Sequence, residues 1–276
     1  MARSLVAAGL DVYSPSSTEW DLLAPFDGSI IPAGTDVLVH CAATRSRSDA
    51  GRGGLSREIA MNVSATARLY EAALERKVRR VVHLSTLSVL RLGDEASVDL
   101  PDDAVFVEAP THPYALTKRW GEELVVSLRE EFEAIAIVRP GMSYGPRMQP
   151  SSGMGRVAAR IRSGAPYPLA APDGHRYAPV FIDDVVDVIV RLATSTSNVT
   201  VNVAGEPVWE RQLAADVARW MGTQLRIETD ASERPRSVVP STRSLDYLFP
   251  DRVRTDWERG SRLAFGDDAS SMLAPG

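Results

Sequence analysis

Short, nearly continuous hydrophobic runs alternate along this chain with longer stretches in which hydrophobic residues recur at helical spacing. Three of the runs, residues 36–43, 80–85 and 134–139, are apolar enough to be strands covered on both faces. Between them, residues 62–77 and 114–132 carry hydrophobic positions three and four residues apart. The alternation predicts βαβ units, in which helices cross over between the strands of a parallel sheet.

The pattern changes near residue 147, where proline, glycine and serine become frequent. We therefore expect a first domain over residues 1–147 and a smaller, mixed α/β lobe over residues 148–276, of which residues 180–204 return to the first domain's sheet. Phe181–Val185 is expected to be a strand end that meets a helix running to about Thr194, and another helix is expected over residues 213–221. The predicted class is α/β, with a doubly wound parallel sheet.

Composition narrows the class of protein further. The 276 residues are 44% hydrophobic and 24% charged, which is typical of a globular chain with a sizeable core. A formal net charge of −5 argues against nucleic acid or an anionic membrane as the main partner. The single cysteine, Cys41, and four histidines without ligand spacing predict no metal site. Cysteine usage and the lack of a long apolar run predict a cytoplasmic protein.

The strongest chemical signal is the pair Tyr114 and Lys118 on a predicted helix. Four-residue spacing stacks both side chains on one helix face. A lysine ammonium stabilises a neighbouring phenolate, which would lower the pKa of Tyr114 from its usual value of about 10. Thr86 follows a predicted strand, and strand ends carry the sites of parallel α/β sheets. The three residues predict acid–base chemistry on a hydroxyl or carbonyl group.

Seven segments, in this order, resemble the extended short-chain dehydrogenase/reductase family, which includes nucleotide-sugar epimerases, dehydratases and reductases. They are Asp36–Ala43, Asn62–Thr66, Val81–Thr86, Tyr114–Lys118, Arg139–Pro146, Phe181–Val185 and Val201–Gly205. The resemblance covers nearly the whole chain. It implies a Rossmann-like sheet, NAD or NADP as cofactor, a nucleotide sugar as the small-molecule substrate, and a homodimer.

The resemblance also implies roles for individual residues. Tyr114 is expected to be the catalytic acid/base, Lys118 to lower its pKa and bind the nicotinamide ribose, and Thr86 to donate to the substrate oxygen. Hydride would pass between the nicotinamide and a substrate carbon. The residues expected at the cofactor are Asp21 and Leu22 at the adenine, and Ala42, Ala43, Pro140 and Gly141 along its length.

The family's glycine-rich turn between the first strand and the first helix is missing from this sequence. Residues 2–9 predict the end of that helix, stopped by Gly9, and residues 11–13 predict the second strand. We expect Met1 to be an internal methionine, with about 15–25 residues lost before it. A true remnant, with a gap between the second and fourth strands, is the alternative. Gly51–Gly54 is expected to form a mobile loop on the substrate side rather than a phosphate cradle.

Further departures from the family narrow the expected reaction. Leu87 and Ser88 follow Thr86 where the family's 4,6-dehydratases carry an Asp–Glu pair, so dehydration is not expected. Met142 replaces an asparagine that often meets the substrate. Arg176 lies one position from the place of the family's pyrophosphate-binding arginine, and Arg147 lies nearby in the expected site. Either arginine could pair with phosphate or be an ordinary solvated side chain.

Other candidate residues have structural interpretations. Cys41 is expected to fill space in a strand, and Asn62 to be an interior side chain bonded to backbone. His40 and His83 lie inside apolar strands and are expected to be hydrogen-bonded core residues. Asp183 and Asp184 precede a predicted helix and are expected to cap it, and Glu122 is expected to be a charge on a helix surface.

These observations leave three functions open. The leading one is an NAD(P)-dependent oxidoreductase or epimerase that acts on a secondary alcohol or ketone of a nucleotide sugar. Met142 and the shifted Arg176 favour a carbonyl reductase with a non-nucleotide substrate. The missing phosphate-binding turn favours a third function, that of a cofactor-free remnant that serves as a binding module.

Overall fold

The computed structural model describes residues 1–45, 51–90, 97–100, 112–229 and 237–266, which belong to two compact units. Unit 1 comprises Met1–Arg91, Asp103–Arg139 and Val186–Val201. Unit 2 comprises Leu92–Asp102, Pro140–Val185 and Asn202–Gly276. The chain therefore leaves the first unit after Arg139 and returns to it within a single helix.

A parallel sheet forms the centre of unit 1. Its strand order is β1-β2-β4-β9, where β1 is Val37–His40, β2 is Arg80–Leu84, β4 is Ala134–Pro140 and β9 is Val199–Val203. The first three strands run parallel, with Val37 opposite Arg80 and Arg80 opposite Ala134. Six consecutive residues of β4 are buried, as the continuous hydrophobic run predicted for a strand covered on both faces.

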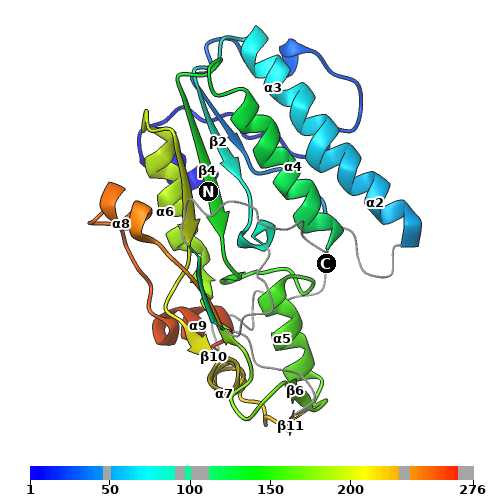
Figure 1. Ribbon diagram of the computed structural model, residues 1–276, viewed down its shortest axis with the longest axis vertical. Helices are drawn as coiled ribbons and strands as arrows, with labels where there is room; N and C mark the ends of the chain where they lie inside the picture. The colour runs from blue at the N-terminus through cyan, green and yellow to red at the C-terminus, as the bar shows by residue number, and fades with distance from the viewer. Residues whose placement is uncertain (46–50, 91–96, 101–111, 230–236, 267–276) are drawn as a thin grey trace. The chain divides into compact units, whose positions relative to one another are not determined.

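Helices cover both faces of this sheet, which confirms the predicted doubly wound architecture. In Figure 1, α3 (Thr66–Glu75) and α4 (Pro113–Ser127) lie on one face, and α6 (Ile182–Ala193) lies on the other. The predicted helix over residues 62–77 begins instead with a π-helical turn, η2 (Ala60–Ala65), that leads into α3. A short 3-10 helix, η1 (Gly28–Ile30), packs against α3.

Residues 11–13 do not form the second strand that the sequence predicted. Helix α1 (Ala2–Ala7) ends as expected before Gly9, whose φ of +84° favours glycine. Among the described residues, however, β1 is the outermost strand of its sheet. Residues 11–13 therefore have no ladder to join, and a short extended segment gains no stability without one. The predicted gap between a second and a fourth strand is not formed.

Gly51–Gly54 is also not the predicted loop. These residues begin helix α2 (Gly51–Ile59), which continues through η2 into α3. Glycine has a low helix propensity, but tertiary packing routinely overrides a weak local preference. Here α2 packs against α4, and that contact supplies the stability that the glycines lack.

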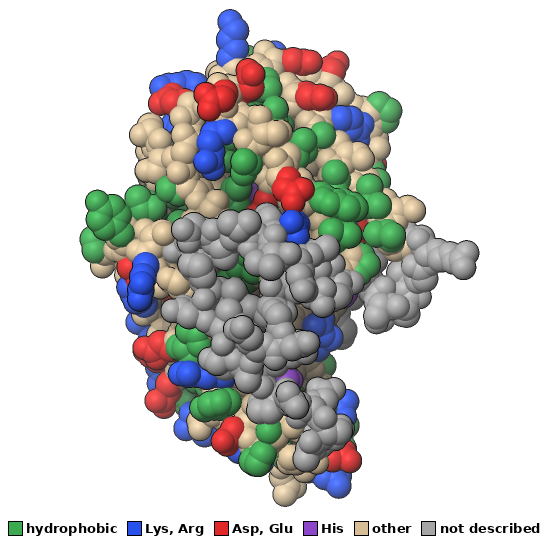
Figure 2. All heavy atoms as spheres, viewed as in Figure 1, with side chains coloured by type: hydrophobic (Ala, Val, Ile, Leu, Met, Phe, Trp, Pro, Cys, Tyr) green, Lys and Arg blue, Asp and Glu red, His purple; other side chains and the backbone are tan. Residues whose placement is uncertain are grey.

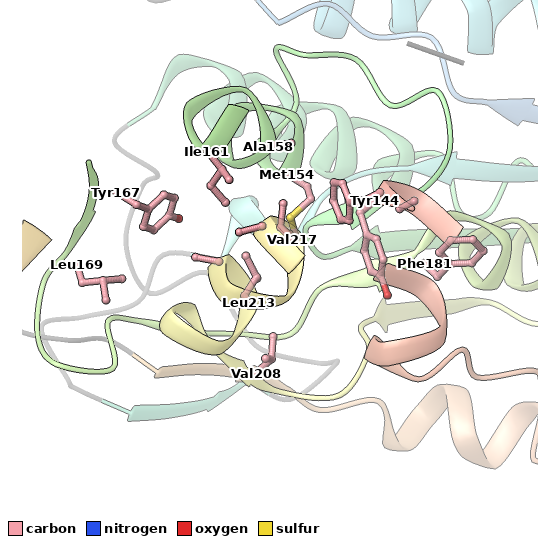
Figure 3. Close-up of a cluster of buried hydrophobic side chains, with 14 residues drawn as sticks. Tyr144, Met154, Ala158, Ile161, Tyr167, Leu169, Phe181, Val208, Leu213 and Val217 are labelled. Atoms are coloured by element: carbon pink, nitrogen blue, oxygen red, sulfur yellow. The ribbon is translucent and has the colours of Figure 1, made fainter. Parts of the chain in front are cut away.

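Unit 2 is a mixed α/β unit built around one hydrophobic core. Side chains of α5 (Gly153–Arg162), α7 (Glu210–Trp220) and α9 (Trp257–Phe265) fill it, with Met154 and Leu213 completely buried. In Figure 3, Met154, Leu213 and Val217 gather between α5 and α7. The predicted helix at residues 213–221 is thus α7, which begins three residues earlier at Glu210.

Short strands complete unit 2. Two of its sheets are pairs: β5 (Ser143–Tyr144) with β8 (Val180–Phe181), and β6 (Tyr167–Leu169) with β11 (Ile227–Thr229). A third sheet has the strand order β10-β7-β12-β3, where β10 is Val208–Trp209, β7 is Arg176–Tyr177, β12 is Ser237–Pro240 and β3 is Ser97–Leu100. A short helix, α8 (Arg243–Leu248), follows β12. Asp184, predicted as a helix cap, accepts hydrogen bonds from the Thr255 backbone N–H at 2.8 Å and hydroxyl at 2.7 Å, so its role is structural.

Surface charge is mixed in sign. Acidic and basic side chains are interspersed over the described residues of the face in Figure 2, in keeping with the small net charge of −5. Within the described ranges, every helix is too short or too polar to cross a membrane.

Leu213 tests the core of unit 2. Leu213→Ala is expected to lower the free energy of unfolding by about 2–5 kcal/mol, because the side chain is completely buried and its removal leaves a cavity. Leu263→Ala is the matched control, since Leu263 on α9 is 42% exposed. Urea denaturation followed by circular dichroism measures both. An equal loss in the two variants would contradict this assignment of the core.

Candidate active site at the start of helix α4

The beginning of α4 places Tyr114 and Lys118 in successive turns, as their spacing predicted. His112 is the N-cap, and its Nδ1 accepts a hydrogen bond from the Tyr114 backbone N–H at 3.2 Å. Pro113 occupies the first helical position, where its fixed φ suits a helix start. Tyr114 therefore lies in the first turn, where the positive end of the helix dipole favours a phenolate.

Lys118 is a buried cation. The residue is only 3% exposed, and this burial lowers the pKa of Lys118 to about 8. The carboxylate of Glu122, one helical turn further on, opposes this effect and raises the pKa. Since the resulting value still lies above neutral pH, Lys118 keeps its positive charge there.

Glu122 is buried, and the prediction of a charge on the helix surface was wrong. The residue is 2% exposed and forms a two-point ion pair with Arg139 at the end of β4. Arg139 Nη2 lies 2.7 Å from Glu122 Oε2, and Arg139 Nε lies 3.0 Å from Oε1. The two contacts with Arg139 satisfy the oxygens of this buried carboxylate and hold it one helical turn from Lys118.

The surroundings of Tyr114 favour its protonated, phenol form. Burial raises the pKa of Tyr114 above its ordinary value, the opposite of the shift predicted from Lys118 alone. The Arg45 guanidinium, whose Cζ lies 5.4 Å from the centroid of the Tyr114 ring, lowers that pKa. The buried carboxylate of Glu58 on α2 raises it further. Sequence reasoning missed both residues, although Arg45 follows a strand end and Glu58 lies one turn before Asn62.

Thr86 caps a short helix next to α4. Its Oγ1 accepts a hydrogen bond from the Ser88 backbone N–H at 3.2 Å and donates to Ser88 Oγ at 3.3 Å. The capped helix, η3 (Leu87–Val89), packs against α4. The structure thus brings the turn that carries Thr86 to the helix that carries Tyr114 and Lys118, all within unit 1.

Asn62 ties the loop after β1 to α4. Its Oδ1 accepts from the Thr44 backbone N–H at 2.8 Å, and its Nδ2 donates to the Thr44 carbonyl at 2.8 Å and to Thr117 Oγ1 at 3.0 Å. Thr117 in turn donates to the Tyr114 carbonyl at 3.0 Å. The predicted backbone bonds of Asn62 are confirmed. The side chain projects from η2, and π-helical turns often occur at functional sites.

Two buried histidines, His40 and His83, feel the charge of Lys118. His40 Nε2 is 3.0 Å from Thr66 Oγ1, and His83 Nδ1 is hydrogen-bonded to the Tyr70 hydroxyl, as predicted for core histidines. Burial lowers the pKa of His40 to about 3 and that of His83 well below its ordinary value, so both rings are neutral. Over the described ranges, His, Cys, Asp and Glu side chains form no cluster of three or more suited to a metal ion.

The residues predicted along the cofactor fall in several places. Ala42 and Ala43 are exposed after the end of β1, directly before Thr44, whose backbone is hydrogen-bonded to Asn62. Asp21 accepts from the Leu23 backbone N–H at 3.0 Å, while Leu22 is buried in the core of unit 1. Pro140 and Gly141 belong to unit 2, where the Gly141 N–H donates to the Val203 carbonyl at 2.9 Å.

The three residues predicted at the substrate all belong to unit 2. Met142 packs half-buried against the unit's core, and Arg147 is exposed with a φ of +61°. The guanidinium of Arg176 lies 5.8 Å from the ring centroid of Trp209. The buried Nε of Arg176 has no hydrogen-bond partner in the part of the chain that the structure describes.

The chain resembles known proteins in sequence and in fold. Residues 11–204 match the model of the NAD dependent epimerase/dehydratase family. The low-salt glycan biosynthesis protein Agl12 of Haloferax volcanii is 29% identical over 58% of this chain and 51% of its own length. The chain thus spans about half the length of this curated relative.

Solved structures share the fold. The UDP-glucuronic acid 4-epimerase of Bacillus cereus, in complex with NAD, matches 92% of this chain and 80% of its own, with a TM-score of 0.76 and 20% identity. The RMD protein of Pseudomonas aeruginosa, complexed with NADPH, matches 97% of this chain and 95% of its own, with a TM-score of 0.77 and 22% identity.

Lys118 offers a direct test of the electrostatics. The chain has two lysines, so protein labelled with ¹³C-lysine gives two side-chain signals, and Lys77→Arg identifies the Lys118 signal. We expect that signal to titrate with a midpoint near pH 8, because burial disfavours the ammonium. Glu122→Gln is expected to move the midpoint lower, since it removes the carboxylate that raises the pKa. A midpoint at the ordinary lysine value of about 10.4 would contradict the buried environment.

Proposed function

This chain belongs to the NAD dependent epimerase/dehydratase family, and we propose that it oxidises or reduces a secondary alcohol or ketone of a nucleotide sugar, as an epimerase or a reductase. One observation carries the proposal. Tyr114 and a buried, charged Lys118 begin a helix that packs against the turn carrying Thr86, within a single unit. This arrangement supplies an acid/base, a cation and a hydrogen-bond donor for one substrate oxygen.

The residues of this site fit the nicotinamide end of NAD or NADP. Among the described residues, the Lys118 ammonium forms no hydrogen bond or ion pair, so its N–H groups are available to ribose hydroxyls. Ala42 and Ala43 present small, exposed side chains at the end of β1. The sequence contains no G-x-x-G-x-x-G turn for the pyrophosphate. We therefore assign only the nicotinamide end to these residues, with Asp21 and Leu22 proposed for the adenine.

Proton transfer is the task of Tyr114. When bound, the nicotinamide supplies the carbon that accepts or donates a hydride. As an alcohol is oxidised, the Tyr114 phenolate accepts the proton of the substrate hydroxyl at its Oη, and in the reverse direction the phenol returns it. Lys118 and the positive end of α4 stabilise the phenolate. Thr86 Oγ1, which donates to Ser88 at 3.3 Å, turns that proton toward the substrate oxygen.

The residues around Thr86 and in unit 2 narrow the proposal. Leu87 and Ser88 after Thr86 carry no carboxylate, so the proposed reaction stops short of the elimination step of a dehydratase. Arg176, with a buried Nε that lacks a partner among the described residues, is proposed to bind the diphosphate of the substrate, together with Arg147. Met142 is proposed to contact the sugar. We also propose that the protein acts as a homodimer.

Met142 supports a second candidate function. A thioether offers the substrate an apolar contact where an amide would offer hydrogen bonds, which suits a ketone without sugar hydroxyls. In that case the same Tyr114, Lys118 and Thr86 would serve a carbonyl reductase that takes a non-nucleotide substrate.

Tyr114→Phe tests the proposed function. Loss of the phenolic proton is expected to lower turnover by about 10²–10⁴-fold while the melting temperature and dinucleotide binding stay unchanged. Nucleotide sugars and simple ketones are offered with NAD(H) or NADP(H), and products are separated by chromatography. Tyr247→Phe is the matched control, because Tyr247 is 87% exposed.

The outcomes separate the candidates. Turnover of a UDP- or dTDP-sugar that is lost in Tyr114→Phe supports the leading proposal, and turnover of simple ketones alone supports the second. Full activity in Tyr114→Phe excludes Tyr114 as the acid/base. A chain whose melting temperature no dinucleotide raises, and which turns over no substrate, would exclude both candidates in favour of a binding module.

A further inference from the structure

Arg45 and Tyr114 are anchored to the same buried amide. Both backbone polar groups of Thr44, the residue before Arg45, are hydrogen-bonded to Asn62 at 2.8 Å. Asn62 also donates to Thr117, whose hydroxyl donates to the Tyr114 carbonyl. The guanidinium of Arg45 lies 5.4 Å from the centroid of the Tyr114 ring, within the range of a cation–π contact. One side chain, Asn62, thus ties together the backbone just before Arg45 and the backbone of Tyr114.

Glu58 brings the opposite charge from another element. It lies on α2, which packs against α4, and it is 1% exposed. A carboxylate that has little contact with water is poorly screened by salt, and Glu58 raises the pKa of Tyr114. Arg45 is exposed, and its effect on Tyr114 is correspondingly more open to screening by salt.

Among the described residues, Arg45 and Glu58 are the two charged side chains that shift the pKa of Tyr114. On α4 itself, Lys118 lies one turn further on, and His112 caps the helix. Two of the elements packed against α4, η2 and η3, contain no ionisable side chain. On α3, Arg68 donates its hydrogen bonds to the carbonyls of Leu22 and Ala24.

We propose that Arg45 and Glu58 are opposed positioning residues for Tyr114, with the guanidinium stabilising the phenolate and the carboxylate stabilising the phenol. The inference rests on the acid–base role proposed for Tyr114. Burial alone would hold the phenol protonated, and Glu58 strengthens that preference. Arg45 lowers the pKa of Tyr114 and so opposes the effects of burial and of Glu58. The pKa of Tyr114 therefore depends on Arg45, which follows β1 in the chain.

The test is a direct titration of the Tyr114 hydroxyl. Protein labelled with ¹³Cζ-tyrosine gives one signal for each tyrosine, and Tyr114→Phe identifies the signal that belongs to this site. Arg45→Gln is expected to raise the pKa of Tyr114 by about 0.5–1 unit, and Glu58→Gln to lower it by a similar amount. Arg45→Lys, which keeps the charge, should lie closer to the unmodified protein than Arg45→Gln does.

Arg57→Gln is the control for the loss of a charge. Arg57 precedes Glu58 on α2 but is exposed, so its removal should leave the Tyr114 titration unchanged. Raising the salt concentration is expected to shrink the effect of Arg45→Gln more than that of Glu58→Gln. Should Glu58→Gln fail to fold, the comparison of Arg45→Gln with Arg45→Lys decides the matter for Arg45.

Opposite shifts in the two charge-removing variants support the proposal. Shifts in the same direction, or a Tyr114 titration that neither substitution moves, overturn it, because a merely structural role would not separate the two signs. The result is independent of turnover. Full activity in Tyr114→Phe would reject the proposed function while leaving the titration shifts in place, whereas unmoved titrations would reject only this inference.

Discussion

The candidate site depends on one buried amide that must satisfy its hydrogen bonds inside the protein. Asn62 is 2% exposed, and an unpaired buried polar group costs about 1–3 kcal/mol. The carbonyl and amino groups find their partners on Thr44 and Thr117, which belong to the loop after β1 and to α4. Moving either element would leave polar groups without partners, so the amide sets the distance between the strand end and α4.

Two opposing effects set the pKa values of Tyr114 and Lys118. Burial favours the neutral form of each group, whereas Glu122 and Arg45 favour the charged forms. Loss of water raises the pKa of Tyr114 and lowers that of Lys118, which moves both groups toward their neutral forms. Glu122, held by Arg139, favours the ammonium of Lys118, and Arg45 favours the phenolate of Tyr114. The chemistry proposed for the site therefore depends on charges outside the Tyr114–Lys118 pair.

Local patterns predicted the elements whose stability is local or whose burial is complete. The runs at residues 80–85 and 134–139 are strands because both faces are covered, and the spacing of Tyr114 and Lys118 identified α4. Residues 11–13 failed as a strand because pairing depends on a neighbour that no local pattern reveals. Gly51–Gly54 failed as a loop because α4 supports a helix there.

The site could be predicted only in part for a similar reason. Spacing and resemblance pointed to Tyr114, Lys118 and Thr86, and the structure brings their elements together in unit 1. Arg45, Glu58 and the buried state of Glu122 follow from packing between elements far apart in the sequence, which a helical pattern does not encode. The roles of Arg147, Arg176 and Met142 stay predictions.

Two buried, neutral histidines make the stability of the fold depend on pH. His40 and His83 each have a pKa below the ordinary 6.5 in the folded chain, so they take up protons more readily once the chain unfolds. As the pH falls below about 6.5, the two histidines bind protons in the unfolded state but stay neutral in the folded state. The free energy of unfolding therefore decreases. The same two buried rings of β1 and β2 thereby make the stability of the sheet that carries the candidate site depend on pH.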